Sequence, residues 1–346
     1  MNVIVYYSKY IMENNNFSNI KTAFIIGTGR CGTTILGQIF GKHPDIFVAR
    51  KEFRILIDPD GLISLKRGFV DDWSPNNAHM AIKRFKQLIK SFGTCFAPYP
   101  GVSLREVFGK KDWDIETKRF IEELISFAYK GAWGGEDNLV GKVILHYFNL
   151  RRFNPFIKKI YYHGALEEKY FFEISQKFVY RIIEKKLDQL KKNIWIDHTP
   201  GICLHPDFII KLFPQAKFLY IYRDPRDVVC SYKSVDWAPD DTFKSAEIVR
   251  DILERWSNTK IFLPKNSFIE IKFEDLVEDT SGIVDYICNW LGISSTREMI
   301  KFDLSKNNMG RWKTDLSDNE KEFLNKAFSE YLISNGYSLT TSLNLN

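Results

Sequence analysis

One stretch constrains the fold of this chain more than any other: residues 21–40, KTAFIIGTGRCGTTILGQIF. Its first part, residues 21–27, is a short apolar run that ends in a glycine, which is typical of a buried strand. After Gly32 apolar side chains recur at helical spacing, at Ile35, Leu36, Ile39 and Phe40. A strand, a glycine-rich turn and a helix in this order predict a phosphate-binding element of a parallel α/β sheet.

The turn nearly matches the P-loop pattern G-x-x-x-x-G-K-[ST]. Gly27 and Gly32 occupy the two glycine positions and Thr34 occupies the hydroxyl position. Thr33, however, replaces the lysine that contacts the β- and γ-phosphates of a nucleoside triphosphate. Arg30 can supply the missing positive charge as a planar fork. The turn therefore predicts an anion site, formed by backbone N–H groups and a helix N-terminus, without the lysine that a triphosphate needs.

A second anion site is predicted by YRDPRDVVCS, residues 222–231, which follows a strongly apolar strand. Asp224 suits an N-cap and Pro225 the first position of a helix. Arg223 then lies at the carboxyl end of a parallel strand, where open α/β sheets bind ligands, and Ser231 adds a hydroxyl. A kinase needs an acidic magnesium ligand after such a strand, and the cap explains Asp224 better. The sequence predicts two anion sites and no metal site.

Strands and helices alternate along much of the 346-residue chain, which predicts an α/β fold with a central parallel sheet flanked by helices. Residues 1–20 are expected to be a lead-in, turn-rich over residues 14–19, and residues 21–340 are expected to form a single domain. Within it, residues from about 55 to 190 contain three stretches of helical periodicity separated by Gly- and Pro-rich turns. We expect them to form a helical insertion over the sheet.

The composition excludes several classes of protein. The net charge is +6, but Lys and Arg are interspersed with Asp and Glu, so no nucleic-acid partner is expected. The five cysteines are scattered and form no zinc motif or disulfide framework, which favours a reducing compartment. No signal peptide and no run of ~20 apolar residues stands out, so we expect a cytoplasmic protein without a membrane span.

Taken together, the motifs resemble those of the sulfotransferases that use 3′-phosphoadenosine 5′-phosphosulfate (PAPS). GTGRCGTT resembles their 5′-phosphosulfate loop, and RDPRDVVCS their 3′-phosphate motif, with arginine and serine eight positions apart. IKFEDLVED resembles the Y-E-D-L strand, with Phe273 in place of tyrosine, and MGRWKTDLSDNE resembles the G-x-W-[KR] segment that closes over the nucleotide. These landmarks run in family order from about residue 21 to 320, and the pattern is nearest to bacterial and tyrosylprotein sulfotransferases.

The resemblance implies a P-loop NTPase-like sulfotransferase fold and PAPS as co-substrate, with no metal, because a leaving group without a γ-phosphate needs neither the Walker lysine nor magnesium. It implies that the 5′ end of the nucleotide is bound by Arg30, Cys31, Gly32, Thr33 and Thr34. It implies Arg223 and Ser231 for the 3′-phosphate, and Arg311, Trp312 and Lys313 as candidates in the closing segment. The Cys31 thiol, at a helix N-terminus, is expected to be reactive.

Two residues compete for the role of general base. The family places a glutamate in E-x-R soon after H-P-D, and HPDIFVARKEFR supplies Glu52 and Arg54 with one extra residue, so the resemblance implies Glu52. His198 in WIDHTPG stands where the family often has lysine, and it can polarise the sulfate or act as base near neutral pH. Asp197 is expected to orient His198 or to cap the next turn. The resemblance also implies a catalytic role for Arg30, which stands where the family places a lysine or arginine near the bridging oxygen.

The function expected is in-line transfer of a sulfuryl group from PAPS to a hydroxyl or amine of a small molecule, glycan, lipid or peptide. The aromatic-rich insertion is expected to form part of the acceptor pocket. One alternative is a P-loop nucleotide kinase or related NTPase, for which the sequence offers neither the lysine nor a metal carboxylate. Another is a nucleotide-binding module without catalysis. The oligomeric state cannot be read from the sequence.

Overall fold

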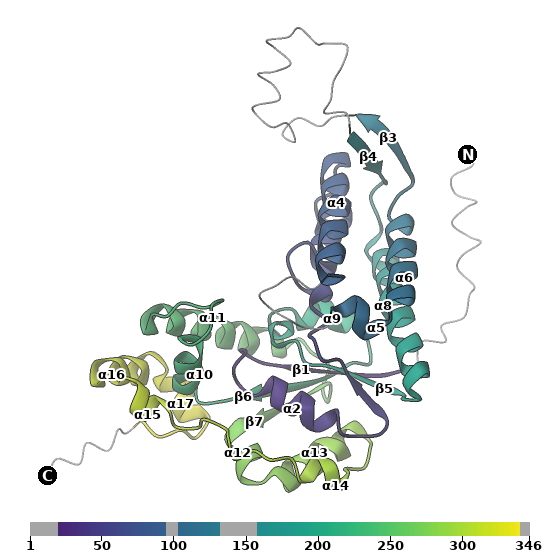
Figure 1. The fold of residues 1–346 in the computed structure, drawn as a ribbon. Helices are drawn as coiled ribbons and strands as arrows, with labels where there is room; N and C mark the ends of the chain where they lie inside the picture. The colour runs from purple at the N-terminus through teal and green to yellow at the C-terminus, as the bar shows by residue number, and fades with distance from the viewer. Residues whose placement is uncertain (1–19, 95–102, 132–157, 340–346) are drawn as a thin grey trace, which may run out of the picture.

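A five-stranded parallel sheet forms the centre of the computed structural model, which describes residues 20–94, 103–131 and 158–339 (Figure 1). Its strands stand in the order β2-β5-β1-β6-β7. They are β1 (Lys21–Ile26), β2 (Ile46–Val48), β5 (Ile194–Asp197), β6 (Lys217–Tyr222) and β7 (Phe268–Lys272). The predicted α/β fold with a central parallel sheet and flanking helices is confirmed.

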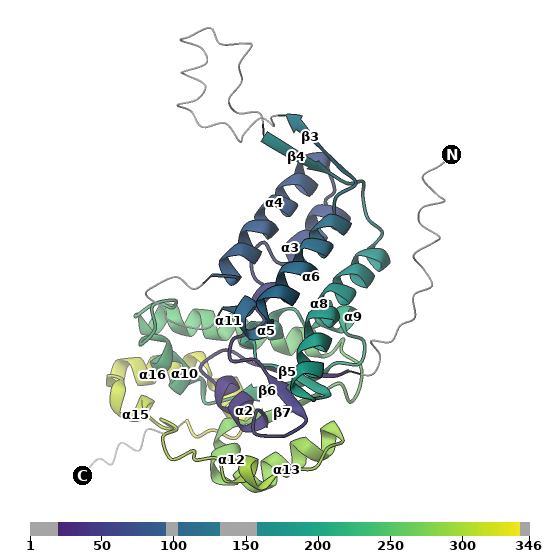
Figure 2. The same ribbon diagram turned by 45° about the vertical axis from the view of Figure 1, so that its right-hand side comes forward.

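The strand β1 shows how the sheet separates two hydrophobic cores. Its side chains alternate between the two faces, so that Phe24 and Ile26 enter one buried cluster while Ala23 and Ile25 enter the other. Helices cover both faces, with α2 (Thr33–Phe40), α12 (Phe273–Glu278) and α13 (Thr280–Leu291) on one side and α8 (Glu168–Leu190) and α9 (Pro206–Leu212) on the other (Figures 1 and 2). Burial on both faces explains why β1, β5 and β6 read as nearly continuous apolar runs, whereas the edge strand β7 exposes Glu270.

Helices also dominate the chain between β2 and β5, and they stand over one face of the sheet (Figure 2). Its elements, beside α8, are η2 (Arg54–Leu56), α3 (Leu62–Lys66), η3 (Arg67–Asp71), α4 (Pro75–Phe92), α5 (Leu104–Phe108), α6 (Lys110–Glu123), β3 (Phe127–Gly131) and β4 (Lys158–Tyr162). The two strands were not expected. The helical pattern over residues 113–130 breaks after Glu123, because Phe127 pairs with Tyr162 across an antiparallel ladder and their rings stack 4.7 Å apart.

The remaining helices lie between β5 and the end of the described chain. They are η4 (Pro200–Leu204), α10 (Pro225–Tyr232), α11 (Thr242–Lys260), α14 (Arg297–Ile300), α15 (Trp312–Asp315), α16 (Asp318–Ala327) and α17 (Ser329–Ser334), with α9, α12 and α13 named above. Among the described residues, every helix is too short or too polar to span a lipid bilayer.

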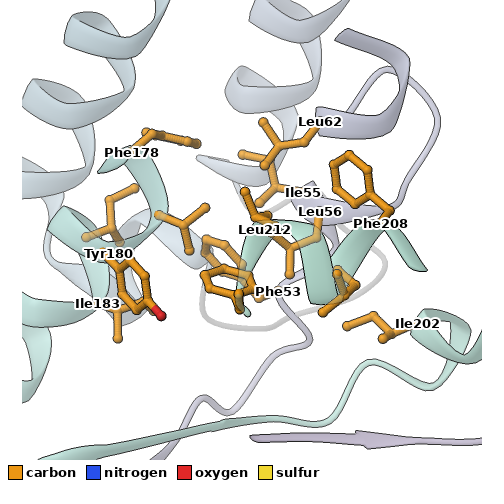
Figure 3. Close-up of a cluster of buried hydrophobic side chains, with 14 of the residues drawn as sticks. Phe53, Ile55, Leu56, Leu62, Phe178, Tyr180, Ile183, Ile202, Phe208 and Leu212 are labelled. Atoms are coloured by element: carbon orange, nitrogen blue, oxygen red, sulfur yellow. The ribbon is translucent and has the colours of Figure 1, made fainter. Parts of the chain in front are cut away.

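The parallel direction of the strands decides where a site can form. The carboxyl ends of β1, β5, β6 and β2 meet at the same edge of the sheet, and each is followed by one of the segments singled out in the sequence. A core cluster supports the neighbouring segment after β2, where Phe53, Ile55 and Leu56 point toward side chains of α8 and α9 (Figure 3). The edge therefore has a rigid base.

Candidate active site

The glycine-rich loop after β1, residues 27–32 and here called the anion loop, has an unusual backbone. Gly29, Arg30 and Gly32 have φ values of 76°, 55° and 109°, all in a region that side chains disfavour. Gly32 also has no room for a side chain, because a Cβ there would lie 2.5 Å from the Phe273 ring. Arg30 adopts this conformation although it carries a side chain, which is a local strain typical of ligand sites.

Neighbouring segments hold the anion loop in place from several directions. The Gly27 N–H donates to Pro200 O at 3.2 Å, and the Cys203 thiol donates to Gly27 O at 3.2 Å. The Tyr232 hydroxyl at the end of α10 donates to Thr28 O. Three contacts from two other elements keep the loop preformed, which lowers the entropic cost of binding an anion.

Two side chains of the anion loop and its helix point away from solvent. Cys31 is fully buried, and this burial raises the pKa of its thiol, so the expectation of a reactive thiolate is wrong. The thiol packs beneath the loop, and only the backbone N–H of Cys31 remains for a ligand. Thr33 is also buried, whereas Thr34 and Arg30 are exposed. Arg30 and Thr34 are the two side chains of this stretch that a ligand can reach.

The two predicted anion sites lie side by side. The Arg30 Nε donates to Ser231 Oγ at 2.9 Å, although the residues are 201 positions apart. Arg223, at the end of β6, is buried, with its guanidinium 5.1 Å from the Phe273 ring. Phe273 therefore touches both sites, because its ring also limits the space at Gly32.

Arg223 has a buried donor without a partner. Its Nη2 donates to Asp227 at 3.1 Å and to Asn308 O, while its Nε is buried and has no hydrogen-bond partner. A buried guanidinium N–H without a partner is costly, and a phosphate oxygen would satisfy it. This orphaned donor fits the predicted 3′-phosphate site.

The closing segment, residues 309–320, is attached to α10 by a residue that the sequence did not single out. The Asp227 carboxylate accepts the Gly310 N–H at 2.7 Å and the Trp312 N–H at 3.0 Å. Trp312 is buried, and the Arg226 guanidinium lies over its indole, 3.8 Å from the centre of the indole ring. Arg311 forms an ion pair with Asp315 at 2.7 Å.

The Trp312 ring is thus occupied by contacts inside the protein. Lys313 is exposed, which makes it the more available of the two cations predicted there. The second aspartate of D-P-R-D was the sequence signal for this attachment, but its partners lie 83 and 85 positions away and could not be inferred.

Glu52 follows β2 and is half-buried beside the carboxyl end of β5. Burial, and after it the Asp197 and Asp58 carboxylates, together raise the pKa of Glu52 to about 7, while Arg54 opposes them. Arg54 is itself paired with Asp58 at 2.9 Å. Among the described residues no hydrogen bond or ion pair holds the Glu52 carboxylate. Such a carboxyl can accept a proton near neutral pH.

His198 lies directly after β5 and is buried, with 6% of its surface exposed. Its ring packs against Gly37 of α2, where a Cβ would lie 3.2 Å from the imidazole Cγ. Burial lowers the pKa of His198, while Asp197 opposes the shift, so the ring is neutral at pH 7. Its Nδ1 is buried and has no hydrogen-bond partner. His198 thus contacts the helix that begins at the anion loop, and the residue before it, Asp197, contacts the segment of Glu52.

Asp197 connects these two candidates. Its Oδ1 accepts the Phe53 N–H at 2.9 Å and its Oδ2 accepts the Thr199 N–H at 3.1 Å. The second contact caps the following turn, as expected. The first contact was not anticipated, because no local pattern links residues 144 positions apart. Asp197 makes no hydrogen bond to His198 among the described contacts.

Comparison with known proteins identifies the family. A family model described as "Sulfotransferase family" matches residues 116–297, which is more than half of the chain. The chain belongs to the sulfotransferase family. The match includes His198, Arg223 and Ser231 but neither the anion loop nor Glu52, so the roles of the latter depend on the geometry above. No match was found among curated protein sequences.

Several solved sulfotransferase structures are similar to this sulfotransferase at low identity. The sulfotransferase domain from the curacin biosynthetic pathway is 12% identical, with 93% of this chain and 99% of that one covered and a TM-score of 0.49. The sulfotransferase domain of the Synechococcus PCC 7002 olefin synthase is 14% identical, with coverages of 87% and 82% and a TM-score of 0.45. Sulfotransferase STF9 from Mycobacterium avium is 13% identical, with coverages of 92% and 78% and a TM-score of 0.44.

An exposed tryptophan that no sequence motif indicated lies beside the anion loop of this sulfotransferase. Trp237 is 62% exposed and packs edge-on against Tyr232, with ring centres 4.9 Å apart. Its indole lies 3.8 Å from the position of a Cβ on Gly29. An indole held at this place offers a flat apolar face to a ligand ring. Within the described ranges, no three His, Cys, Asp or Glu side chains are arranged to hold a metal ion.

Proposed function

We propose that this sulfotransferase moves the sulfuryl group of PAPS to a hydroxyl or amine acceptor by in-line displacement. The single observation that carries the proposal is the contact between Arg30 and Ser231, which joins the anion loop to the segment after β6. Two anion sites in contact, without the P-loop lysine, suit a nucleotide with separate 5′ and 3′ phosphate groups. The unpartnered Nε of Arg223 supports the same assignment.

In this proposal the anion loop binds the 5′-phosphosulfate through the backbone N–H groups of residues 30–34 and the Thr34 hydroxyl. Arg30 lies beside the bridging oxygen and stabilises the charge that develops on the departing phosphate. Arg223 and Ser231 bind the 3′-phosphate, and Lys313 and Arg311 approach from the closing segment, which Trp312 anchors. Cys31, Gly32 and Thr33 contribute backbone only.

The chemistry needs one proton acceptor. Glu52 takes the proton of the acceptor hydroxyl while the acceptor oxygen forms a bond to sulfur and the bond from sulfur to the bridging oxygen breaks. The products are the sulfated acceptor and adenosine 3′,5′-bisphosphate. Since the pKa of Glu52 is about 7, a large fraction is ionised at neutral pH. His198, neutral and with an unpartnered ring nitrogen, is suited to donate a hydrogen bond to the transferring group.

Residues 21–340 work as one catalytic unit in this proposal, with the helical segment between β2 and β5 lining the acceptor side. The acceptor is a small molecule, glycan, lipid or peptide, and the reaction takes place in the cytoplasm without a metal or nucleic acid. Trp237 provides a stacking face for an acceptor ring.

The test is transfer of radiolabelled sulfate from PAPS to a panel of phenols, sugars, lipids and tyrosine peptides. We expect Glu52→Gln to lower turnover by ~10²–10⁴, the scale of general-base loss, and to leave the affinity for adenosine 3′,5′-bisphosphate unchanged. Arg223→Ala should weaken bisphosphate binding by roughly 10–100-fold, because it removes a charge-assisted contact. Full activity of Glu52→Gln would transfer the base role to His198.

Two exposed residues supply matched controls. Glu122 and Arg250 form only solvent-exposed pairs, with Lys118 and Glu254. Glu122→Gln and Arg250→Ala should leave both turnover and bisphosphate affinity unchanged. Tight bisphosphate binding without transfer to any acceptor would instead favour a non-catalytic module.

A further inference from the structure

The segment that carries Glu52 is fixed at the next residue, Phe53. Its side chain is fully buried and meets the rings of Phe108 and Trp195 edge-to-face, with centres 5.2 Å and 5.7 Å apart. Figure 3 shows Phe53 inside the cluster that the segment after β2 shares with α8 and α9. Its N–H donates to Asp197 Oδ1 at 2.9 Å. Both the side chain and the backbone of Phe53 are therefore held.

Asp197 is a carboxylate in a fully buried position at the end of β5. It is 0% exposed, and burying a carboxylate costs free energy unless hydrogen bonds compensate. Two backbone N–H groups, of Phe53 and Thr199, provide this compensation, one to each oxygen. The two contacts tie the segment after β2 to the end of β5, where His198 follows.

The charge of Asp197 also acts on its neighbours. It raises the pKa of Glu52, second only to burial in effect, and raises that of His198. The other charged groups that act on Glu52 are Asp58, which raises its pKa, and Arg54, which lowers it. Arg54 and Asp58 are paired with each other on the same segment, so Asp197 is the carboxylate that acts from another element of the fold.

We propose that Asp197 is a positioning residue of the transfer reaction, whose carboxylate holds the Phe53 N–H and so directs Glu52 toward the acceptor. This inference rests on the function proposed above. Asp197 touches neither donor nor acceptor and acts through Glu52. Its removal should change the reaction of the acceptor and leave the binding of the nucleotide intact.

The first test is Asp197→Asn, which preserves the shape of the side chain but removes the charge and one acceptor. We expect kcat to fall about 10–100-fold, as misplacement of a reacting group does, while the Kd for adenosine 3′,5′-bisphosphate stays within about twofold. The acid limb of the pH profile of kcat/KM should move to lower pH, because Glu52 loses a neighbouring negative charge. A role limited to stability would not move this limb.

Asp58→Asn is the matched control. Asp58 also raises the pKa of Glu52, but its carboxylate pairs with Arg54. The Phe53 N–H is bound by Asp197 and not by Asp58. This variant should move the acid limb in the same direction with much less loss of kcat. Comparing Asp58→Asn with Asp197→Asn separates the effect of a nearby negative charge on Glu52 from the effect of the hydrogen bond to the Phe53 N–H.

A double-mutant cycle shows whether Asp197 acts through Glu52. If it does, adding Asp197→Asn to Glu52→Gln should lower kcat no further, since the base is already absent. If Asp197 acts through His198, the second substitution should lower kcat again, and the proposal is overturned. Full activity of Glu52→Gln alone would refute the base and with it the positioning role, whereas an impaired Glu52→Gln that Asp197→Asn impairs further would refute only the positioning role, so the two failures are distinguishable.

Asp197→Glu provides a second variant if Asp197→Asn does not fold. It keeps the charge but displaces the carboxylate by one methylene. We expect a lower kcat with the acid limb near its wild-type position. Wild-type kcat in a folded variant at position 197, or a loss of bisphosphate affinity that parallels the loss of kcat, would contradict the positioning role.

Discussion

At the scale of the residue, Glu52 combines the two properties that a general base near neutral pH requires. Its carboxyl is shielded enough to hold a proton more tightly than an exposed glutamate, and it is free of the ion pairs that occupy Arg54 and Asp58. The same environment makes the ionised form unfavourable in the folded protein. A base tuned in this way reduces stability where it is active.

This cost predicts a stability difference that depends on pH. The pKa of Glu52 is about 7 in the folded protein and 4.5 for an ordinary glutamate, so folding favours the protonated form. The free energy of unfolding therefore decreases as the pH rises from about 4.5 to 7, and it does not recover at higher pH. Glu52→Gln avoids this loss and should be more stable than wild type by about 1–3 kcal/mol at pH 8, with little difference at pH 4.5.

Thermal unfolding at both pH values measures the difference, with Glu122→Gln as the control whose effect should not vary with pH. A gain for Glu52→Gln that is equal at pH 4.5 and pH 8 would mean that Glu52 ionises normally in the folded protein. Glu52 would then lack the raised pKa that favours it over His198 as the general base.

At the scale of the element, the strand-loop-helix unit around the anion loop carries most of what the sequence revealed. The loop was predicted because its determinants are local: an apolar strand, glycines at fixed spacing and a helix. Gly32 shows why the spacing matters, since its φ of 109° and the nearby Phe273 ring both exclude a side chain.

Gly32→Ala should consequently disrupt the loop. A Cβ would lie 2.5 Å from the Phe273 ring in a backbone conformation that alanine disfavours, so we expect a loss of about 1–3 kcal/mol of stability. Bisphosphate affinity should fall with it, because the helix N-terminus shifts. Gly164→Ala is the control, because a Cβ there meets nothing within 4 Å. Calorimetric titration and thermal unfolding would measure both effects, and unchanged affinity would remove the anion loop from the site.

The features that the sequence did not reveal depend on contacts between distant elements. Asp197 accepts the N–H of Phe53, and Asp227 accepts the N–H of Trp312. Because almost any residue has a backbone N–H, the residue types at positions 53 and 312 do not indicate these contacts. The thiol of Cys31 occupies a helix N-terminus, as its position in the sequence indicated, yet tertiary packing buries it. The strands β3 and β4 pair with each other across 26 residues that lie outside the described ranges.

At the scale of the whole molecule, the proposed nucleotide would bridge parts of the fold that share no secondary structure. The anion loop connects β1 to α2, Arg223 follows β6, and Ser231 lies in α10. The closing segment is attached to α10 through Asp227. A ligand that contacts all three stabilises the folded state against global unfolding, since the unfolded chain cannot bind it. The hydrophobic cores on both faces of the sheet place these parts in contact before the ligand arrives.

Adenosine 3′,5′-bisphosphate should therefore raise the midpoint of thermal unfolding. At a ligand concentration of 100 times Kd the stabilisation is about 2.7 kcal/mol. Glu52→Gln should keep the shift, since the proposed base would not contact the nucleotide, and Arg223→Ala should lose most of it. ATP with magnesium at the same concentration should give a much smaller shift, because the anion loop lacks the lysine that binds the γ-phosphate. An equal, magnesium-dependent shift with ATP would instead support a kinase, since the P-loop would then bind a triphosphate by another cation, for which exposed Arg30 is the candidate.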